Sequence, residues 1–319
     1  MATKKLNHLL PRMVIKRWEE NNGKIFDKEK NKIRKVNKYD YSEKYYYSLG
    51  KEDDELENRI STFETYIGNI LKQLNVAQNS IELTKKDLEI LKLYVVLQSC
   101  RNNNTSPVIK NDESGIYINN NYFFGVPLVT TQEEAVKVTT LICDEFNKIK
   151  NSNDNFDNTT SQFCLGLHLV IVTNENNEFI ISETTSIIEC TMDSNYLFAY
   201  VPISPKLGLI LTNSKYYFSE KDIEFTKRRF GNKYGNGKPD SYLSELLSDN
   251  KLVYNGTETN NKIKLNFVKL AKEEIYSLNS IIYENGNKIL FCNESSLEEA
   301  KNKNPVREIY IEDIFKNTK

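Results

Sequence analysis

Several polar side chains occupy positions where helices usually carry apolar ones. In one predicted helix, Glu57 and Glu64 fall into the three-then-four spacing of the apolar residues around them. In the next, the apolar stripe continues into Gln98 and Arg101, and Asn279 interrupts a similar stripe near the C-terminus. Residues three and four apart share one helix face, so these polar groups are predicted to point towards the core.

A second group of reactive side chains lies near the N-terminus, where His8 stands close to Arg12. Histidine can exchange a proton near neutral pH, and arginine can bind a phosphate through two parallel hydrogen bonds. Together with the helical groups, they would form a metal-independent acid–base set suited to cutting a phosphodiester. The candidate catalytic residues are His8, Arg12, Glu57, Glu64, Gln98 and Arg101.

The same residues also fit a purely structural role. Buried charges need partners because removing their water is costly, and ion-pair networks are common in folded proteins. In that interpretation Arg12 and Arg101 neutralise Glu57 and Glu64, while the amide side chains satisfy backbone groups. The sequence leaves both interpretations open.

No metal ion or cofactor is expected. Glu57 and Glu64 are seven residues apart, about 10 Å along a helix axis, so they cannot both bind one ion in a regular helix. The other histidine, His168, begins an apolar strand-like segment and is predicted to be a core residue. Neither a dinucleotide-binding glycine motif nor a phosphate-binding P-loop motif is present.

The overall charge gives no general attraction to nucleic acid, since 43 Lys and Arg residues balance 44 Asp and Glu residues. Locally, the first forty residues are strongly basic and include Lys16 and Arg17, which are candidate substrate-binding residues. A smaller basic cluster lies within residues 227–238. Either cluster could contact phosphate, or could simply face water.

Composition also bears on location and origin. The five cysteines are scattered without paired spacing, which predicts neither a disulfide framework nor a zinc site. No apolar run approaches the length of a signal peptide or of a bilayer-spanning helix, so a cytoplasmic protein without membrane contact is expected. The richness in Asn, Lys, Ile and Tyr is typical of AT-rich genomes, such as those of low-GC bacteria and their phages.

Periodicity and turn residues predict an α+β fold, with long helix pairs packed on a mainly antiparallel sheet and an N-terminal β-hairpin. The hairpin is expected within residues 14–36, with turns at 21–23 and 27–31. Helices are expected at 53–74, 84–101, 130–150 and 262–284, the last ending in a left-handed glycine cap at 285–286. Strands are expected at 168–173 and 178–182, paired as a hairpin, and at 199–203, 207–211 and 288–292.

The chain is expected to form one α+β domain over residues 1–319. A subdivision is also compatible with the pattern, with a hairpin and helical part at 1–150 and a sheet with the C-terminal helix at 161–319.

The opening string of Asn7, His8, Leu9, Leu10, Pro11 and Arg12, followed by Trp18, resembles the start of the domain of unknown function family known as DUF 4238. Glu57 and Glu64 resemble its double-glutamate helix, Gln98 and Arg101 its helix-end pair, and Leu278 with Asn279 its late Leu-Asn motif. Residues 179–183 and 202–205 resemble two further motifs, although Glu183, Thr184 and Thr185 replace the family's Asp-Asn-Pro.

If that turn contributes to a site, Ser182, Glu183 and Asn279 are further candidate substrate-binding residues. The family occurs in bacteria and phages, so the resemblance suggests a part in host–phage conflict by association only. Two functional classes therefore remain. One is a nucleic-acid hydrolase acting as a toxin or defence effector, with RNA favoured over DNA. The other is a non-catalytic sensor that recognises a phage component, a nucleotide or a partner protein.

Overall fold

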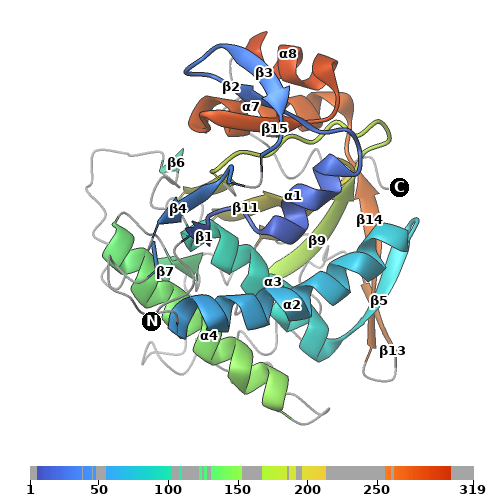
Figure 1. Cartoon of the computed structure of the whole chain (residues 1–319). Helices are drawn as coiled ribbons and strands as arrows, with labels where there is room; N and C mark the ends of the chain where they lie inside the picture. Colours follow the sequence, from blue (N-terminus) through green and yellow to red (C-terminus); the bar gives the residue numbers. More distant parts are fainter. Residues whose placement is uncertain are drawn as a thin grey trace.

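The computed structural model describes residues 6–37, 39–44, 46–47, 55–101, 108–109, 122–123, 126–127, 131–152, 167–184, 187–191, 196–212, 256–259 and 262–302. These residues form an α+β structure in which helices pack on mainly antiparallel sheets, as predicted (Figure 1). The basic segment at 227–238 lies outside the described residues.

The central sheet runs in spatial order through β13 (Gly256–Thr259), β14 (Lys262–Lys269), β9 (His168–Thr173), β12 (Leu207–Thr212), β11 (Tyr196–Pro202), β10 (Ile187–Thr191) and β6 (Val108–Ile109). The β14–β9 and β10–β6 pairs are parallel, and the other pairs are antiparallel. Strand β5 (Ser80–Thr84) pairs with the first part of β14, and from Phe267 onwards the same edge of β14 pairs with β9. Strands β11 and β12 confirm the strands predicted at 199–203 and 207–211.

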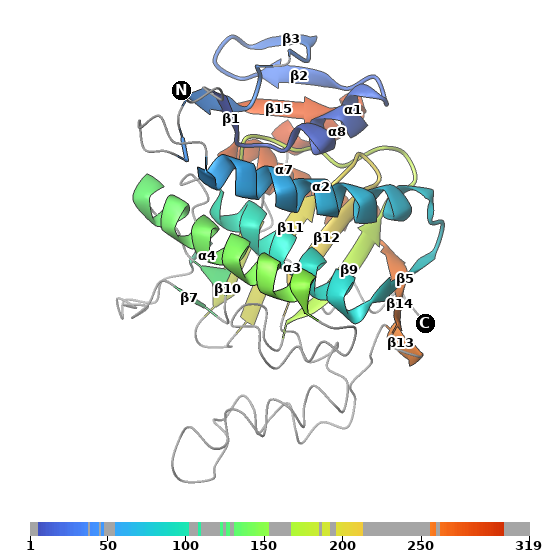
Figure 2. The ribbon, with the colours of Figure 1, turned by 60° about the horizontal axis from the view of Figure 1, so that its bottom comes forward.

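Three helices cover one face of this sheet: α2 (Glu55–Val76), α3 (Lys85–Cys100) and α4 (Gln132–Asn151) (Figure 2). They confirm three of the predicted helices. Thr84 begins α3 by accepting a hydrogen bond from the backbone of Asp87, and Thr131 begins α4 in a reciprocal capping box with Glu134. Helix α3 lies between the sheet and the other two helices, so every residue from 88 to 100 is buried.

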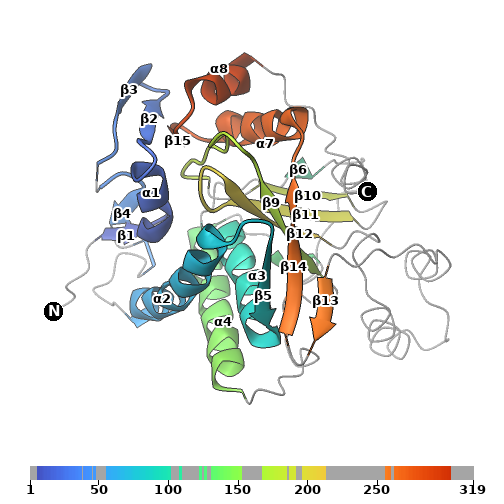
Figure 3. The same ribbon diagram turned by 90° about the vertical axis from the view of Figure 1, so that its right-hand side faces the viewer.

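The central sheet is buried on both faces. Successive side chains of a strand point to opposite faces, and here both sets are apolar. On β9, Leu169 and Ile171 join the core beneath the α2–α4 layer, whereas Val170 and Val172 join the core on the opposite face. Helices α7 (Lys272–Asn285) and α8 (Glu294–Asn302) cover that second face (Figure 3). Double burial explains why β9 reads as a nearly continuous apolar run.

A smaller sheet contains the N-terminal hairpin. Strands β2 (Lys24–Asp27) and β3 (Lys32–Lys35) form it, and β15 (Lys288–Phe291) pairs with the other edge of β2. Asn22 and Asn31 adopt positive φ in the two predicted turns. Arg34 donates two hydrogen bonds to the buried Asp40 carboxylate, at 2.7 and 2.6 Å. Both sheets thus take strands from both halves of the chain.

The predicted hairpin began too early, because Arg12–Glu19 is a helix, α1. Val14, Ile15 and Trp18 share one face of this helix and are buried, a three-and-four spacing that the prediction of an alternating segment over 14–36 overlooked. The Trp18 indole donates a hydrogen bond to the carbonyl of Phe179 at 3.3 Å. Helix α1 packs against α2, where a Cβ on Gly68 would meet Met13 at 3.5 Å.

The long helix predicted at 262–284 is wrong in its first third. Residues Lys262–Lys269 form strand β14, and the helix starts only at Lys272. Ile263 and Leu265 are buried while Lys262 and Lys264 are exposed, which is the two-residue period of a strand. Backbone pairing with β5 and β13 outweighs the helical spacing of the same side chains.

The hairpin predicted between 168–173 and 178–182 is also wrong. Strand β9 pairs with β12 and β14 instead, and residues 178–184 cross to the smaller sheet, where Ile181 bridges to Leu290. Asn174 redirects the chain, because its amide donates to the carbonyl of Pro205 at 2.9 Å and accepts from the backbone of Glu178 at 2.9 Å. We call residues 178–184 the crossing segment.

Two short strand pairs complete the described elements. Strand β1 (Leu6–His8) pairs antiparallel with β4 (Ser42–Lys44), and β7 (Tyr122–Phe123) pairs with β8 (Val126–Pro127). Within the described part of the chain, none of the helices combines the length and the apolar character that a bilayer-spanning segment requires.

Candidate functional site

A group of polar side chains comes together where α1, α2 and α3 meet. Its members come from distant parts of the sequence and influence one another electrostatically. We call the group the polar cluster, and it consists of Arg17, Tyr47, Glu57, Glu64, Tyr94 and Arg101. Four of these residues were predicted as site residues from their spacing or charge.

The ion pair between Glu64 and Arg101 is the centre of the polar cluster. Arg101 follows the last turn of α3, and its guanidinium donates a hydrogen bond to the Glu64 carboxylate. The Arg101 side chain is 1% exposed and that of Glu64 is 21% exposed, so solvent reaches the pair from the α2 side. Burial alone lowers the pKa of Arg101, but the attraction of Glu64 and the other acidic groups outweighs it and raises that pKa overall.

Tyr47 and Glu57 flank this pair. The guanidinium carbon of Arg101 lies 5.8 Å from the centre of the buried Tyr47 ring. Burial raises the pKa of the Tyr47 phenol, the positive charge of Arg101 partly opposes the rise, and Glu57 adds to it. Glu57 therefore belongs to the same electrostatic environment as Glu64, which lies two helical turns later in α2. The two glutamates lie on the same face of the helix, as their spacing predicted.

Arg17 and Tyr94 form the other side of the polar cluster. Arg17 on α1 is 7% exposed, and its Nη1 has no hydrogen-bond partner among the described residues. Burial lowers its pKa, partly opposed by Tyr94 and Glu20. Burial also raises the pKa of Tyr94, while Arg101 and Arg17 both act to lower it. The Tyr94 hydroxyl therefore lies under the influence of both arginines.

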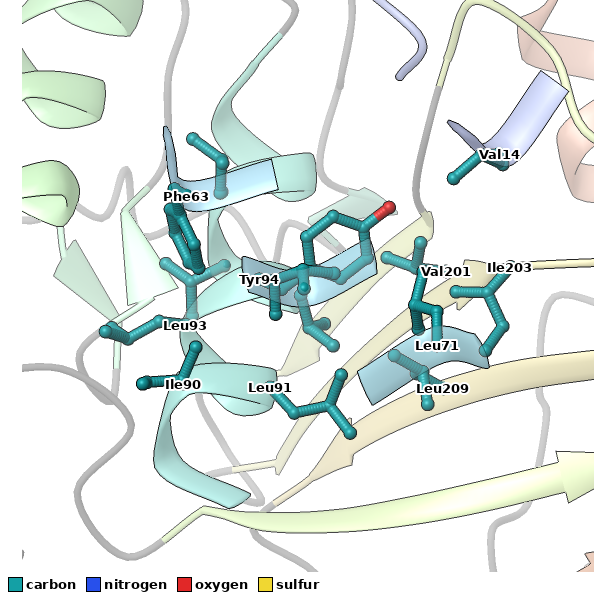
Figure 4. Packing of buried hydrophobic residues seen from close by; sticks show 14 of the residues in the cluster. Val14, Phe63, Leu71, Ile90, Leu91, Leu93, Tyr94, Val201, Ile203 and Leu209 are labelled. Atoms are coloured by element: carbon teal, nitrogen blue, oxygen red, sulfur yellow. The ribbon is translucent and has the colours of Figure 1, made fainter. Parts of the chain in front are cut away.

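The surroundings of Tyr94 are apolar except at its hydroxyl. Figure 4 shows its ring among Phe63, Leu93 and Val201, with the hydroxyl directed away from Ile90. That hydroxyl has no hydrogen-bond partner among the described residues. An unsatisfied hydroxyl at the end of a buried ring is uncommon in folded proteins.

The other catalytic candidates fall into two groups. Gln98 is buried on α3, one turn before Arg101 and one turn after Tyr94, so it shares their helix face. Arg12 is not brought into the polar cluster. Its guanidinium donates two hydrogen bonds to Glu19 on the same helix, at 2.9 and 2.8 Å, and both side chains are partly exposed. Lys16 is exposed on α1.

His8 can be placed only by its backbone, which pairs with Ser42 at the end of β1. Its side chain lies outside the part of the chain that the structure describes. His168 is buried at the start of β9, as predicted for a core residue. Among the described residues, no group of three or more His, Cys, Asp and Glu side chains is placed to hold a metal ion.

Asn279 was predicted to bind substrate, and its amide bonds the protein backbone. Asn279 lies on the buried face of α7. Its side-chain oxygen accepts a hydrogen bond from the backbone nitrogen of Ile180 at 3.2 Å, and its side-chain nitrogen donates one to the carbonyl of Glu178 at 2.8 Å. These bonds replace the strand pairing that the crossing segment lacks at this point.

Ser182 and Glu183 make similar backbone contacts. The Ser182 hydroxyl bonds both backbone groups of Thr184, and the Glu183 carboxylate accepts from the backbone nitrogens of Asn287 and Lys288, at 2.5 and 3.0 Å. None of these bonds joins a member of the polar cluster. The predicted left-handed cap at Gly286 is wrong, since its φ is −102°. Glycine is needed there because a Cβ would lie 2.3 Å from that of Ser182.

Two members of the polar cluster were missed from the sequence. Tyr94 lies in the same three-and-four series as Gln98 and Arg101, but its ring counts as apolar in such a pattern. Nothing in the sequence distinguishes Tyr47 from the neighbouring tyrosines. In chemical terms, the polar cluster offers a carboxylate within reach of water beside buried donors that favour negative charge.

The chain matches one known family over nearly its whole length. The match covers residues 7–296, and the family is described as "Protein of unknown function (DUF4238)". The chain belongs to this family. The match includes every candidate site residue, from His8 to Asn279, and confirms the resemblance inferred from the short motifs. No curated protein and no solved structure matches the chain.

Proposed function

We propose that this protein is a metal-independent hydrolase that cleaves the phosphodiester bonds of RNA. The observation that carries the proposal is the Glu64–Arg101 pair, in which a partly exposed carboxylate lies against a fully buried guanidinium. A carboxylate in reach of solvent can exchange a proton, and a fixed guanidinium can stabilise a phosphate that gains negative charge.

In this mechanism Glu64 takes the proton from a ribose 2′-hydroxyl, whose oxygen attacks the adjacent phosphorus. The bond from phosphorus to the 5′-oxygen breaks, and a protonated His8 supplies the proton that this oxygen needs. Arg101 stabilises the extra negative charge on the phosphate oxygens during the step. The products are a 2′,3′-cyclic phosphate and a free 5′-hydroxyl, so DNA is not a substrate.

The test is cleavage of a labelled single-stranded RNA by purified protein in the presence of a chelator. Glu64→Gln keeps the size of the side chain and removes its basicity, so cleavage is expected to fall at least about 100-fold. Asp144→Asn is the matched control, because Asp144 is a carboxylate paired with Arg59 outside the polar cluster. An RNA with 2′-O-methyl groups should resist cleavage by every variant.

The proposal fails if the unmodified protein leaves the RNA intact, or if Glu64→Gln is as active as Asp144→Asn. A cellular test complements it. Expression of the unmodified chain is expected to arrest growth and degrade cellular RNA, and His8→Ala and Arg101→Ala are expected to relieve both effects. These outcomes would support a role as an effector in conflict between bacteria and phages.

A second candidate is a sensor that binds a nucleotide, a phage component or a partner protein without chemistry. The observation in its favour is that the Glu64 carboxylate already accepts a hydrogen bond from Arg101, a contact that a purely structural pair would also make. A sensor would bind RNA or nucleotides and be stabilised by them, while leaving them uncleaved.

We also propose a cytosolic location. The described cysteines Cys100, Cys143 and Cys292 are unpaired thiols. Burial raises the pKa of each thiol to about 12, which keeps them protonated and unreactive. Buried free thiols of this kind are typical of proteins in reducing compartments.

A further inference from the structure

Arg17 is a buried cation without a counter-charge in contact. It is 7% exposed, it forms no ion pair among the described residues, and its Nη1 lacks a hydrogen-bond partner. An arginine does not relieve this situation by losing its proton, because a guanidinium stays protonated in proteins. Leaving a buried charge uncompensated is unfavourable, so a fold that keeps one usually gains something by it.

Two further unsatisfied donors belong to the same cluster. The Tyr94 hydroxyl and the Nε of Arg101 are buried, and neither has a partner among the described residues. The charges of Arg17 and Arg101 both act on Tyr94, which places the three groups in one electrostatic neighbourhood. Buried donors normally find acceptors, so three unpaired donors in one neighbourhood indicate an acceptor that comes from outside the chain.

We propose that Arg17, Tyr94 and Arg101 together bind the phosphate group of a ligand. Arg17 and Arg101 each carry a positive charge, while Glu64 acts on Tyr94 and Arg101, Glu57 on Arg101 and Glu20 on Arg17. The unpaired donor atoms of the two guanidinium groups, rather than a net positive charge, therefore favour an anionic acceptor. The donors come from two elements, α1 and α3, and so approach from different directions. A tetrahedral phosphate presents oxygens in several directions, whereas a carboxylate presents two in one plane.

This inference deepens the proposed function, because it assigns the phosphate of the substrate to a defined subsite beside Glu64. It does not require catalysis, since a sensor could use the same subsite. It also distinguishes Arg17 from Arg12 on the same helix, whose guanidinium is already satisfied by Glu19.

The experiment measures binding of inorganic phosphate to the full chain by calorimetry, and thermal unfolding with and without phosphate at constant ionic strength. Phosphate is expected to raise the melting temperature of the unmodified protein. Arg17→Met is expected to weaken phosphate binding about 10- to 100-fold, because it removes a charge-assisted donor. Tyr94→Phe is expected to weaken it about three- to tenfold.

Stability without phosphate separates this role from a structural one. If Arg17 serves a ligand, Arg17→Met removes an uncompensated buried charge and leaves the melting temperature unchanged or higher. If Arg17 only supports the fold, the same substitution lowers it. Tyr94→Phe removes an oxygen without a described partner and gives a second variant with an intact ring.

Arg59→Met is the charge-matched control, because Arg59 lies on α2 and is paired with Asp144. It is expected to bind phosphate as the unmodified protein does. The proposal is overturned if the unmodified protein does not bind phosphate, if Arg17→Met and Tyr94→Phe bind it normally, or if Arg59→Met loses as much affinity as Arg17→Met.

Dimethyl phosphate, tested in parallel, distinguishes the sources of the group. Binding of both probes supports a subsite for an internal phosphodiester, and binding of inorganic phosphate alone supports one for a free or terminal phosphate. RNA cleavage without phosphate binding would leave the hydrolase standing and remove the subsite. Phosphate binding without RNA cleavage would leave the subsite standing and remove the hydrolase.

Discussion

The Glu64–Arg101 pair allows a quantitative test by substitution of each partner. Glu64→Ala leaves the Arg101 guanidinium, 1% exposed, as a buried charge without its hydrogen-bonded partner. Breaking a buried pair in this way costs about 3–5 kcal/mol. The Glu57 carboxylate and the Tyr47 ring remain close to Arg101, so we expect the lower end, a loss of about 3 kcal/mol in the free energy of unfolding.

The reverse substitution should cost less. After Arg101→Met, Glu64 is 21% exposed and can turn towards water, while the methionine replaces most of the buried stem of the arginine. The expected loss is about 1 kcal/mol, the value of a weakly buried pair. The double variant should lose about 2 kcal/mol, less than Glu64→Ala alone, which corresponds to a coupling energy of about 2 kcal/mol.

Urea unfolding followed by fluorescence provides the measurement. The chain contains a single tryptophan, Trp18, which is buried at the contact of α1 with the crossing segment and so reports on packing close to the polar cluster. The midpoints should change while the slopes stay constant. Equal losses for the two single variants, or strictly additive losses in the double variant, would refute the asymmetric burial on which the calculation rests. The exposed pair of Arg59 and Asp144 serves as control, with a coupling below about 1 kcal/mol.

Four other substitutions test the fold. Burial alone raises the pKa of Asp40, but its bonds to Arg34 and to the backbone lower it overall, so its contribution to stability is present at neutral pH. Asp40→Asn should therefore destabilise the protein by about 1–2 kcal/mol at pH 7, and the difference should disappear as the pH falls from about 4 through the lowered folded-state pKa, as urea titrations at several pH values would show. Gly286→Ala forces a Cβ against Ser182 and should cost at least about 2 kcal/mol, whereas Gly68→Ala, in open contact within α2, should stabilise by about 0.5–1 kcal/mol; melting temperatures that move in the same direction would contradict this. Asn279→Ala removes two backbone bonds and should cost about 2–4 kcal/mol while leaving phosphate binding unchanged, and a loss of binding in a folded Asn279→Ala protein would show that this amide serves the ligand.

The sequence predicted the long helices well because their apolar spacing and their caps agree. Thr84 and Thr131 begin helices whose buried faces repeat every three to four residues, so local and tertiary preferences point the same way. The prediction failed where one pattern fits two structures. Residues 262–267 alternate but lie shortly before a true helix, and one partner that makes them a strand, β5, is distant in sequence.

The candidate site was predicted in part for the same reason. Spacing along α2 and α3 was sufficient to bring Glu57, Glu64 and Arg101 together, because both segments are regular helices. Arg12 and Arg17 were both predicted as site residues, and which of them faces the polar cluster depends on α1, most of which was predicted as part of the hairpin within residues 14–36. On a helix, five residues separate these arginines by about 140°, so only one of them can face the polar cluster.

Asn279, Ser182 and Glu183 show a different limit. Their polar types, and the motifs in which they lie, suggest binding residues, but the groups that they bind are backbone atoms of the crossing segment and of residues 287–288. The sequence gives no sign that residues 178–184 leave the strand pairing expected for them. An extended segment that pairs with a strand only through the single bridge of Ile181 to Leu290 needs side chains to satisfy the rest of its backbone, which accounts for these residues in physical terms.

The pairing of β2 with β15 has a consequence for biosynthesis. Lys24 bonds Glu294, 270 positions away, so the N-terminal hairpin completes its sheet only after residues 288–294 have left the ribosome. At 5–20 residues per second, this delay is roughly 15–55 s. During that interval β2 exposes an unpaired edge. A nascent chain therefore keeps the free edge of β2 until the residues of β15 have been synthesised.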